Sequence, residues 1–339
     1  MPMTAINTIN NYQGVIRNAL PHCLTETTYS FGKKYQGKVR DTYDLEDKLI
    51  LITTDRQSAF DRLIAFVPFK GQVLNLLSAF WFDKTGDIVK NHLIKVIHPN
   101  VMVVSDADPI PVEMVVRGYI SGVTNTSLWK NYEKGERIIY GIDFPEGLNK
   151  NQKLKTPVIT PTTKAEKGMH DKQLSAKEIL AKKIISEKIW NQLVKISLAL
   201  FARGSEICFQ RGLILVDTKY EFAIYKGRIM LIDEIHTPDS SRFWKTESYP
   251  KNFKNAAEPE NFDKEFFRMW YTGRGYSGQG SPPKMSRDLM HKTSARYIKI
   301  YEMITGKKFV PQIYPLEKSI EKAVKDYIQL KTPGGVVKN

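Results

Sequence analysis

Residues 211–244 read RGLILVDTKYEFAIYKGRIMLIDEIHTPDSSRFW, and they hold the clearest strand pattern of the chain. The continuous apolar run at 213–216 is typical of a strand that is buried on both faces, and after it the pattern changes to strict alternation. Side chains two positions apart on a strand point the same way, about 7 Å from one another, so Asp217, Lys219 and Glu221 are predicted to share one face. The stretch therefore holds two carboxylates, with an ammonium between them, on one rigid surface.

The turn at 226–227 decides which acid of the returning strand joins that face. A two-residue loop sets Glu221 opposite Ile232 and sends Asp233 to the other side of the sheet. A loop that is one residue longer, with the glycine in the left-handed position, sets Asp233 opposite Lys219. We favour the longer loop, because burying an isolated Asp233 carboxylate costs several kcal/mol, whereas the Lys219 ammonium compensates its charge.

The acids of this hairpin are candidates for a metal site. Asp217, Glu221 and Asp233 form an oxygen-rich cluster that suits a hard divalent cation such as magnesium. The alternative is a solvated hairpin with alternating charges. The following loop, 237–242, favours the functional interpretation, because it places small hydroxyls, a turn and an arginine directly after the carboxylates, as an anion-binding loop requires.

The length and charge of the chain limit its fold class and its partners. A chain of 339 residues favours two lobes or one large α+β body. The formal net charge of +15 indicates polyanionic partners, which are nucleic acid, a membrane surface or small phosphorylated molecules. The basic residues are scattered among acidic ones, without a run of five, so we expect small-molecule substrates and no nucleic-acid partner.

Cysteine usage and the N-terminus indicate the compartment. The two cysteines, Cys23 and Cys208, lie far apart without a partner motif, which fits a reducing compartment and argues against a disulfide scaffold or a cysteine-based zinc site. No basic segment followed by an apolar core stands at the N-terminus, and no apolar run reaches membrane-spanning length. A cytoplasmic protein without a membrane partner is expected.

A proline-punctuated link at 106–111 is the predicted boundary between two lobes. Before it, the patterns at 35–44 and 49–54 predict a β-hairpin. After it, apolar residues at spacings of three and four across 185–200 predict a helix that covers the sheet. The expected organisation is an extension at 1–30 with a short helix, an N-terminal lobe at 31–109, a C-terminal lobe at 110–331 and a frayed tail at 332–339.

Two segments outside the hairpin carry cations that suit phosphate groups. Gly37 lets a ligand approach the first predicted strand, and Lys38 and Arg40, two apart on it, aim two cations at one spot. Arg117 ends a predicted strand at 112–116 and is either a phosphate ligand or a surface arginine at a structural turn. No GxxxxGK[ST] or GxGxxG motif occurs, so neither a P-loop nor a Rossmann site is supported.

These segments together resemble the SAICAR synthetase (phosphoribosylaminoimidazole-succinocarboxamide synthase) family. The segments that carry the resemblance are GKVRD at 37–41, VVRGYISG at 115–122, TPTTKA at 160–165, LVDTKYEF at 215–222 and the acids at 233–234 through SRFW at 241–244. The resemblance implies a two-lobed α+β fold, similar to ATP-grasp and kinase-like architectures, in which an antiparallel N-terminal sheet covers the nucleotide and a larger mixed C-terminal lobe follows.

The resemblance also implies an activity. It is the ATP-dependent ligation of carboxyaminoimidazole ribonucleotide (CAIR) with L-aspartate in de novo purine biosynthesis, which gives SAICAR, ADP and phosphate through an acyl phosphate. The chain is thus expected to be a carbon–nitrogen ligase with ATP as co-substrate and Mg²⁺ as cofactor.

Site residues follow from matching positions. The implied roles are ATP binding for Gly37, Lys38, Arg40 and Lys164; metal binding for Glu221 and Asp233; substrate binding for Arg117, Ser121, Asp217, Lys219, Arg242 and Arg268; and catalysis for Lys219 and for Asp217, our choice of proton acceptor.

The chain departs from the family pattern after Gly122. Many members have Gly-Ser directly before the next helix, whereas four residues, 123–126, intervene here. The hydroxyl that contacts the substrate phosphate is therefore left open among Ser121, Thr124 and Ser127.

Two rival interpretations come from other classes. A basic nucleic-acid-binding protein requires clustered Lys and Arg with interleaved aromatic residues, which the sequence does not show. A kinase shares a lysine-bearing β lobe and carboxylate-bound magnesium, but the HRDxxxxN and DFG signatures are absent. The oligomeric state and the order of substrate binding are not predicted.

Overall fold

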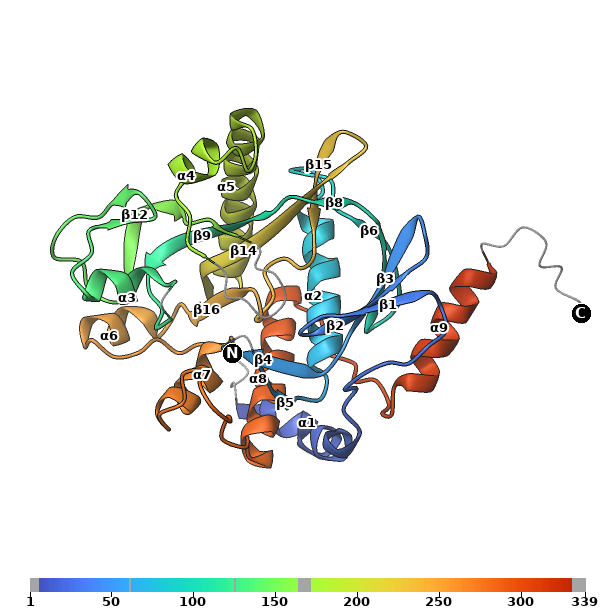
Figure 1. The fold of residues 1–339 in the computed structure, drawn as a ribbon. Coiled ribbons are helices and arrows are strands. Elements are labelled where there is room, and N and C mark those ends of the chain that lie inside the picture. Colours follow the sequence, from blue (N-terminus) through green and yellow to red (C-terminus); the bar gives the residue numbers. More distant parts are fainter. Residues whose placement is uncertain (1–5, 61, 125, 164–171, 331–339) are drawn as a thin grey trace, which may run out of the picture. The chain divides into compact units, whose positions relative to one another are not determined.

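The computed structural model describes residues 6–60, 62–124, 126–163 and 172–330. The chain divides into two compact units, and Figure 1 labels most of their elements. The first unit comprises Met1–Phe80, His92–Asp106 and Phe267–Asn339, and the second comprises Trp81–Asn91 and Ala107–Phe266.

The first unit is built on a five-stranded antiparallel sheet with the order β1-β2-β3-β7-β6. Its strands are β1 (Lys33–Gln36), β2 (Arg40–Asp44), β3 (Lys48–Thr53), β6 (Leu93–His98) and β7 (Val101–Ser105). The unit also contains the hairpin of β4 (Arg56–Ala59) and β5 (Arg62–Phe66), the helices α1 (Ile6–Ala19), α8 (Arg287–Thr305) and α9 (Glu317–Gln329), and a 3-10 turn at Leu20–His22.

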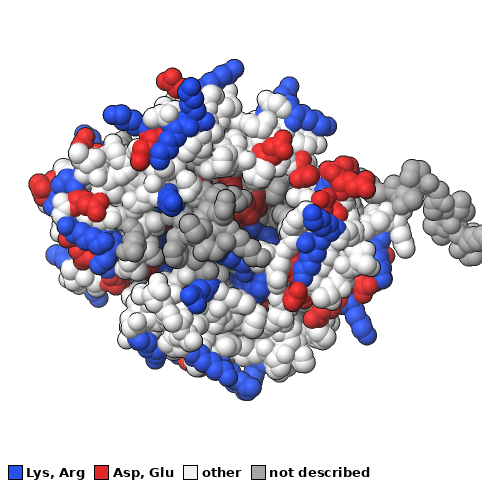
Figure 2. Space-filling view, in the orientation of Figure 1, with Lys and Arg blue, Asp and Glu red and all other residues white. Residues whose placement is uncertain are grey.

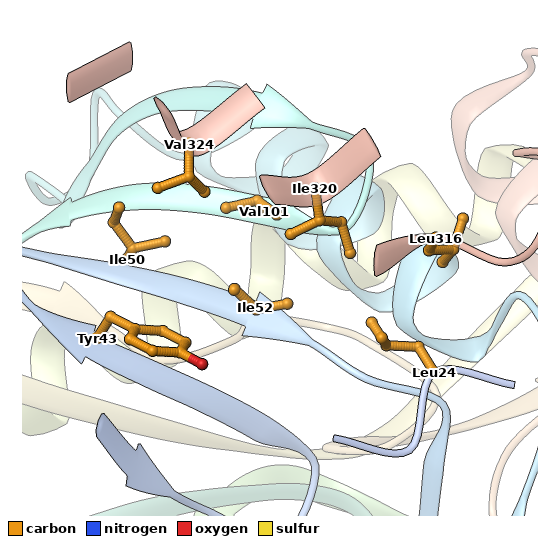
Figure 3. Packing of buried hydrophobic residues seen from close by; sticks show 8 residues of the cluster. All are labelled: Leu24, Tyr43, Ile50, Ile52, Val101, Leu316, Ile320 and Val324. Atoms are coloured by element: carbon orange, nitrogen blue, oxygen red, sulfur yellow. The ribbon is translucent and has the colours of Figure 1, made fainter. Parts of the chain in front are cut away.

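One hydrophobic core cluster of the first unit lies between its sheet and α9 (Figure 3). Ile50 and Ile52 alternate along β3 with less buried neighbours, and both are fully buried. Ile320 and Val324 are one helical turn apart, so they project from the same face of α9 into this core. Each such side chain contributes about 1.5–3 kcal/mol on burial, which fixes α9 to the sheet.

The second unit is built on a seven-stranded antiparallel sheet around one long central strand, β14. Its strands are β8 (Asp108–Pro109), β9 (Val112–Ile120), β12 (Gln152–Ile159), β13 (Thr162–Thr163), β14 (Leu213–Tyr225), β15 (Arg228–Ile232) and β16 (Ser241–Lys245). A separate ribbon is formed by β10 (Ile138–Ile139) and β11 (Ile142–Asp143), and the helices are α3 (Leu128–Glu133), α4 (Ala176–Ala181), α5 (Glu187–Gln210) and α6 (Tyr249–Lys254). Two helices cross between the units along the chain, α2 (Lys70–Lys84) and α7 (Glu265–Thr272).

Helix α5 packs across β14 and β9 (Figure 1). The Ser186 hydroxyl caps its first turn by accepting a backbone N–H hydrogen bond. Leu193 and Leu200, two turns apart, are fully buried. The helix predicted from the spacing at 185–200 is therefore confirmed as a cover of the sheet.

Gly118 allows this helix to approach β9 closely. A Cβ at this position would lie 3.1 Å from the ring of Phe201 on α5. The strand also continues through Ile120, so Arg117 lies inside β9, and the prediction that Arg117 ends its strand is wrong. The glycine after Arg117 thus serves helix–sheet packing.

The first thirty residues are more than an extension. The expected short helix is α1, which runs from residue 6 to 19, and it packs against α8. The Tyr12 hydroxyl lies 2.7 Å from the Glu302 carboxylate and 2.9 Å from the carbonyl oxygen of Phe309. These contacts tie the beginning of the chain to its C-terminal third.

The structure divides the chain differently from the predicted lobes. The expected boundary at 109/110 lies close to the division after Asp106, but residues from Phe267 onward group with the first unit. The physical reason is the packing of α8 on α1 and of α9 on β6, long-range contacts that no local pattern predicts. The expected tail at 332–339 lies outside the described residues.

In the described part of the chain, no helix is both long enough and apolar enough to cross a membrane.

Candidate active site

The β14–β15 hairpin has the shorter of the two loops considered above. Tyr225 pairs with Arg228 and Glu221 pairs with Ile232, so the three-residue loop that we favoured is wrong. The two loop residues at 226–227 both have positive φ, +49° and +75°, as a type I′ turn requires. The match between this turn and the twist of the strands outweighs the argument from the buried charge.

Asp233 nevertheless lies near Lys219. Strand β15 ends at Ile232, and Asp233 has φ +66°, in the left-handed region. This conformation ends the regular alternation of the strand, so the carboxylate is not forced to the far face. Its charge is one of those that raise the pKa of Lys219.

Lys219 is the centre of the acidic cluster. Its Nζ lies 2.6 Å from Oε1 of Glu221 and 2.6 Å from Oε1 of Glu113. Burial lowers the pKa of Lys219, but Glu221, Glu113 and Asp233 outweigh this effect and raise that pKa well above its usual value. The predicted shared face of Lys219 and Glu221 is confirmed by this contact.

Glu113 is a residue of this cluster that the sequence reasoning missed. It stands on β9 within the apolar run VEMVV and is 5% exposed. A single acid in such a run is a signal, because a buried carboxylate requires a partner. Two-residue alternation also places Glu113, Val115 and Arg117 on one face of β9.

The carboxylates of this cluster suit a hard cation that takes only some of its ligands from the protein. Carboxylate oxygens are the ligands that Mg²⁺ prefers, and it usually takes one or two of them together with phosphate oxygens and water. Within the described ranges, no group of three or more His, Cys, Asp or Glu side chains is arranged to hold an ion by itself. Glu221 and Asp233 therefore fit magnesium bound jointly with a phosphorylated substrate.

Asp217 joins two arginines from the strands on either side of it. In the sheet it pairs with Arg117 of β9 and with Arg242 of β16. Oδ2 of Asp217 accepts from Nη1 of Arg117 at 3.1 Å and from Nη1 of Arg242 at 2.5 Å. Arg117 also donates from Nε to Thr160 and from Nη2 to the carbonyl of Thr126. Each of the three guanidinium nitrogens of Arg117 thus donates a hydrogen bond, and one of these bonds orients Asp217.

Two further acids act on Arg242. Its Nη2 lies 3.6 Å from Oε2 of Glu265, and Asp263 accepts backbone hydrogen bonds from Phe243 and Glu265, each at 2.8 Å. Burial lowers the pKa of Arg242, but the three neighbouring carboxylates outweigh burial and raise it. Burial raises the pKa of Asp263 to about 7, against the lowering effect of its hydrogen bonds.

Gly122 leaves room beside Arg242. Its φ is +96°, and a Cβ there would lie 2.9 Å from Nη2 of Arg242 and 2.5 Å from Cβ of Ser127. Of the three candidate hydroxyls, Ser121 donates to Asn151 at 2.8 Å, and Ser127 donates to the carbonyl of Thr124 at 2.6 Å. The structure thus places Ser127 next to the arginine, and Ser121 faces another partner.

In the first unit, Gly37, Lys38 and Arg40 do not lie on one strand. Strand β1 ends at Gln36 and β2 begins at Arg40, and the backbone N–H of Gly37 donates to the carbonyl of Arg40 at 2.8 Å. Lys38 therefore stands in a tight turn between two strands. The predicted alignment of Lys38 and Arg40 on one strand face is wrong, because that turn interrupts the strand. The predicted hairpin with the strand at 49–54 is present as β2 and β3.

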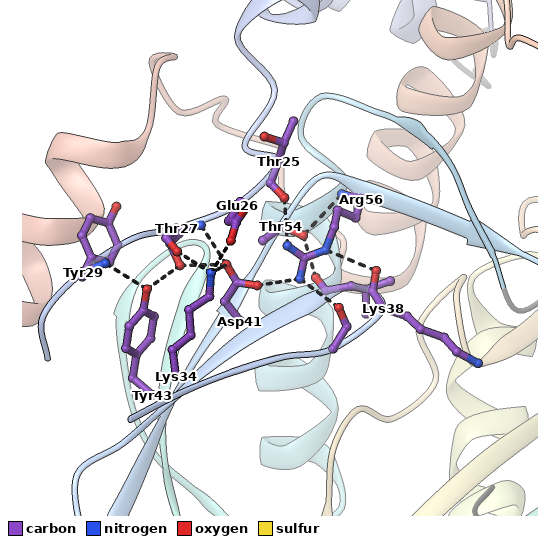
Figure 4. A network of polar contacts seen from close by, with 12 residues as sticks. Thr25, Glu26, Thr27, Tyr29, Lys34, Lys38, Asp41, Tyr43, Thr54 and Arg56 are labelled. Atoms are coloured by element: carbon purple, nitrogen blue, oxygen red, sulfur yellow. Dashed lines mark hydrogen bonds and ion pairs between the residues drawn. The ribbon is translucent and has the colours of Figure 1, made fainter. Parts of the chain in front are cut away.

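Arg56 anchors this turn, and the sequence reasoning missed it (Figure 4). Its guanidinium donates to the carbonyl oxygens of Gly37 and Lys38 at 3.1 and 3.3 Å, and to Oδ1 of Asp41 at 2.7 Å. Asp41 is fully buried and also accepts from the backbone and hydroxyl of Thr27. Figure 4 shows the Lys38 side chain extending away from this network. The backbone of the turn is held while the ammonium stays exposed.

Two more predicted site residues remain. Lys164 lies outside the described residues. Arg268 is half-buried on α7. Lys264 precedes that helix and pairs with Asp239 at 2.9 Å.

The charge distribution agrees with the pattern of the sequence. On the face drawn in Figure 2, Lys and Arg side chains are interspersed with Asp and Glu and do not form one continuous basic patch. The fold is of the α+β class, and an ammonium among carboxylates and two arginines on one aspartate, carried by one antiparallel sheet, are typical of a site for anionic, phosphorylated ligands.

Comparison with known proteins identifies the family. Residues 33–284 match the family model described as SAICAR synthetase. A phosphoribosylaminoimidazole-succinocarboxamide synthase of Legionella pneumophila (strain Lens) is 55% identical over 294 residues, which cover 86% of this chain and 93% of that protein. The chain therefore belongs to the SAICAR synthetase family.

Solved structures agree with this assignment. The SAICAR synthase of Saccharomyces cerevisiae complexed with SAICAR has a TM-score of 0.72 and 31% identity, with 84% of this chain and 99% of that chain covered. A SAICAR synthetase (Type-2) in complex with ADP has a TM-score of 0.62 and 27% identity, with 83% and 100% covered. The expected α+β fold is confirmed, and the chain is an ATP-dependent ligase that joins CAIR to L-aspartate in purine biosynthesis.

Proposed function

We propose that the chain forms SAICAR through an acyl-phosphate intermediate. A carboxylate does not react with an amine at neutral pH, because its carbonyl carbon is a poor electrophile and oxide is a poor leaving group. In the proposed first step, a carboxylate oxygen of CAIR attacks the γ-phosphorus of ATP and ADP leaves. In the second, the aspartate amine attacks the acyl carbon and phosphate leaves.

The observation that carries the proposal is the cluster around Lys219. Phosphoryl transfer needs positioning and charge neutralisation more than covalent chemistry by the protein. The Lys219 ammonium, in contact with Glu221, is a fixed cation for the CAIR carboxylate. Glu221 and Asp233 would hold magnesium, which when bound would neutralise charge on the triphosphate.

The cations of the first unit are assigned to the ATP phosphates. Lys38 is exposed at the tip of a turn whose backbone is held by Arg56, so its ammonium is presented from a rigid base. Arg40 begins the next strand. Together with Gly37 and Lys164, these residues are the proposed ATP-binding set.

Arg242 is the proposed ligand of the ribonucleotide phosphate. Its Nε is buried and has no hydrogen-bond partner among the described residues, so an anionic oxygen would satisfy a donor that is otherwise costly to bury. Gly122 leaves space next to this guanidinium, and Ser127 lies beside it. We assign the open phosphate-binding hydroxyl to Ser127, because a hydroxyl rotates to suit a new acceptor. Arg268 stays part of the proposed substrate set.

Asp217 is the proposed proton acceptor. Both arginines donate to Oδ2 of Asp217, and the proposal assigns Oδ1 to the proton of the aspartate amine. The proposal further includes a cytoplasmic location and small-molecule substrates alone. Recovery of the protein in the soluble fraction after cell lysis, without bound nucleic acid, tests whether it has a membrane or nucleic-acid partner.

An isotope-transfer experiment tests the acyl phosphate. CAIR labelled with ¹⁸O in its carboxylate is incubated with the enzyme, ATP and aspartate, and the released phosphate is analysed by mass spectrometry. The proposed route transfers one ¹⁸O atom from each CAIR molecule to phosphate. Formation of SAICAR with unlabelled phosphate would overturn the intermediate while leaving the overall ligation intact.

A further inference from the structure

Glu113 is held on both sides of its carboxylate. Oε1 accepts from the Lys219 ammonium at 2.6 Å, and Oε2 accepts from the Thr162 hydroxyl at 2.8 Å. Thr162 stands directly opposite Glu113 in the β9–β13 pair, and both side chains are buried. The carboxylate is therefore fixed by a strand-to-strand hydrogen bond and not only by its ion pair.

Lys219 lies between two acids, Glu221 on its own strand and Glu113 on β9. Glu221 and Glu113 contact the ammonium at the same distance, 2.6 Å. A cation bound at Glu221 would compete with the ammonium for the same carboxylate and would repel it. Without its contact to Glu113, the Lys219 ammonium would then either move away or stay on Glu221 and block the cation.

We propose that Glu113 is a positioning residue of the active site, which holds the Lys219 ammonium in place while Glu221 binds a divalent cation. Glu113 itself touches neither the cation nor the reacting atoms. The inference rests on the proposed metal site at Glu221 and Asp233. Thr162 contributes to the same positioning, because its hydroxyl donates a hydrogen bond to Glu113.

A double-mutant cycle on metal affinity tests this role without turnover. Mn²⁺ binding is measured by electron paramagnetic resonance, in the presence of ADP and without CAIR or aspartate, for wild type, Glu113→Gln, Lys219→Met and the double variant, with Mn²⁺–ADP in the absence of protein as the reference. Glu113→Gln is expected to weaken Mn²⁺ binding about 10- to 100-fold, as loss of an outer partner of a metal ligand does. In the Lys219→Met background the same substitution is expected to change affinity less than about threefold, because no ammonium remains to be held.

The possible outcomes distinguish a failure of the positioning role of Glu113 from a failure of the proposed metal site. An equal loss of affinity in both backgrounds would show a through-space charge effect and would overturn the positioning role. An unchanged affinity in Glu113→Gln would overturn it as well. If wild type fails to bind Mn²⁺, the metal site itself fails, and the inference fails with it.

A second pair of variants guards against misfolding of Glu113→Gln. Thr162→Val keeps the volume of the side chain and removes the hydrogen bond to Glu113, whereas Thr162→Ser keeps that bond. Mn²⁺ affinity is expected to fall several-fold in the valine variant and to stay near wild type in the serine variant. Equal Mn²⁺ affinities of the two variants would contradict the proposed positioning of Lys219 by Glu113 and Thr162.

Discussion

The ammonium of Lys219 lies 2.6 Å from Oε1 of Glu221, its neighbour two positions along β14. The contact joins the predicted substrate-binding cation to the predicted metal ligand on one face of a central strand. A strand paired on both sides has little freedom to move, so the two charges are held in fixed positions.

Glu221→Gln is expected to lower turnover by at least about 100-fold, because a neutral amide replaces the charged carboxylate that is proposed to bind magnesium. The melting temperature should stay near that of wild type, since Lys219 keeps its contact with Glu113. Turnover with saturating ATP, CAIR and aspartate is the measurement, with Glu146→Gln, an exposed acid, as the matched control. Full activity in Glu221→Gln would show that the metal assignment is wrong.

Asp233 combines an unfavourable backbone conformation with a predicted metal-binding carboxylate. Both Asp233→Gly and Asp233→Ala remove the carboxylate, so both should lose turnover about 100-fold. They should differ in stability by about 1 kcal/mol in favour of glycine, because only alanine keeps the strain of φ +66°. Urea unfolding of the two variants measures this difference. Equal stabilities would contradict the conformation at Asp233.

Close packing at Gly204 gives a prediction on stability alone. A Cβ there would lie 2.4 Å from Cε1 of His236 and 2.9 Å from Cδ2 of Leu215, so Gly204→Ala is expected to destabilise by about 1–3 kcal/mol. Gly14 in α1 meets nothing within 4 Å, and Gly14→Ala should stabilise by about 0.5–1 kcal/mol. Urea unfolding that ranks the two variants in the reverse order would contradict this packing.

Burial of His236 makes stability dependent on pH. Burial lowers the pKa of His236 to about 3, and its Nε2 lies 2.6 Å from the Tyr220 hydroxyl. The neutral ring thus contributes stability that is complete above the unfolded-state pKa of about 6.5 and is lost as the pH falls toward 3. At pH 5 this loss is about 2 kcal/mol for the one group.

The His236→Asn variant isolates this contribution. Asparagine tolerates the left-handed backbone at this position, φ +48°, and does not titrate. Between pH 7.5 and pH 5, the unfolding free energy of wild type should therefore fall by about 2 kcal/mol more than that of the variant. Parallel pH profiles of the two proteins would show that His236 is not the buried group responsible.

Local patterns predicted the elements that carry the site. The apolar run and alternation of β14 identified the central strand, and period-2 logic placed Lys219 and Glu221 together correctly. The spacing at 185–200 identified α5 for the same reason, because one buried face imposes a repeat on the sequence.

Features that depend on partners far apart in sequence were not predictable in this way. The contact of Glu113 with Lys219 joins residues 106 positions apart, and that of Arg56 with Gly37 joins a strand to an earlier turn. The hairpin loop was misjudged because the charge argument assumed that β15 stays regular through Asp233. Asp233 adopts a left-handed conformation that ends the regular strand, and no sequence pattern predicts this conformation.

Phosphate release from ATP under substrate omission tests the central claim most directly. The account predicts rapid release with both CAIR and L-aspartate present, at one phosphate for each SAICAR formed, and no more than background release when either substrate is left out. Sustained phosphate release with CAIR or aspartate omitted would contradict the account.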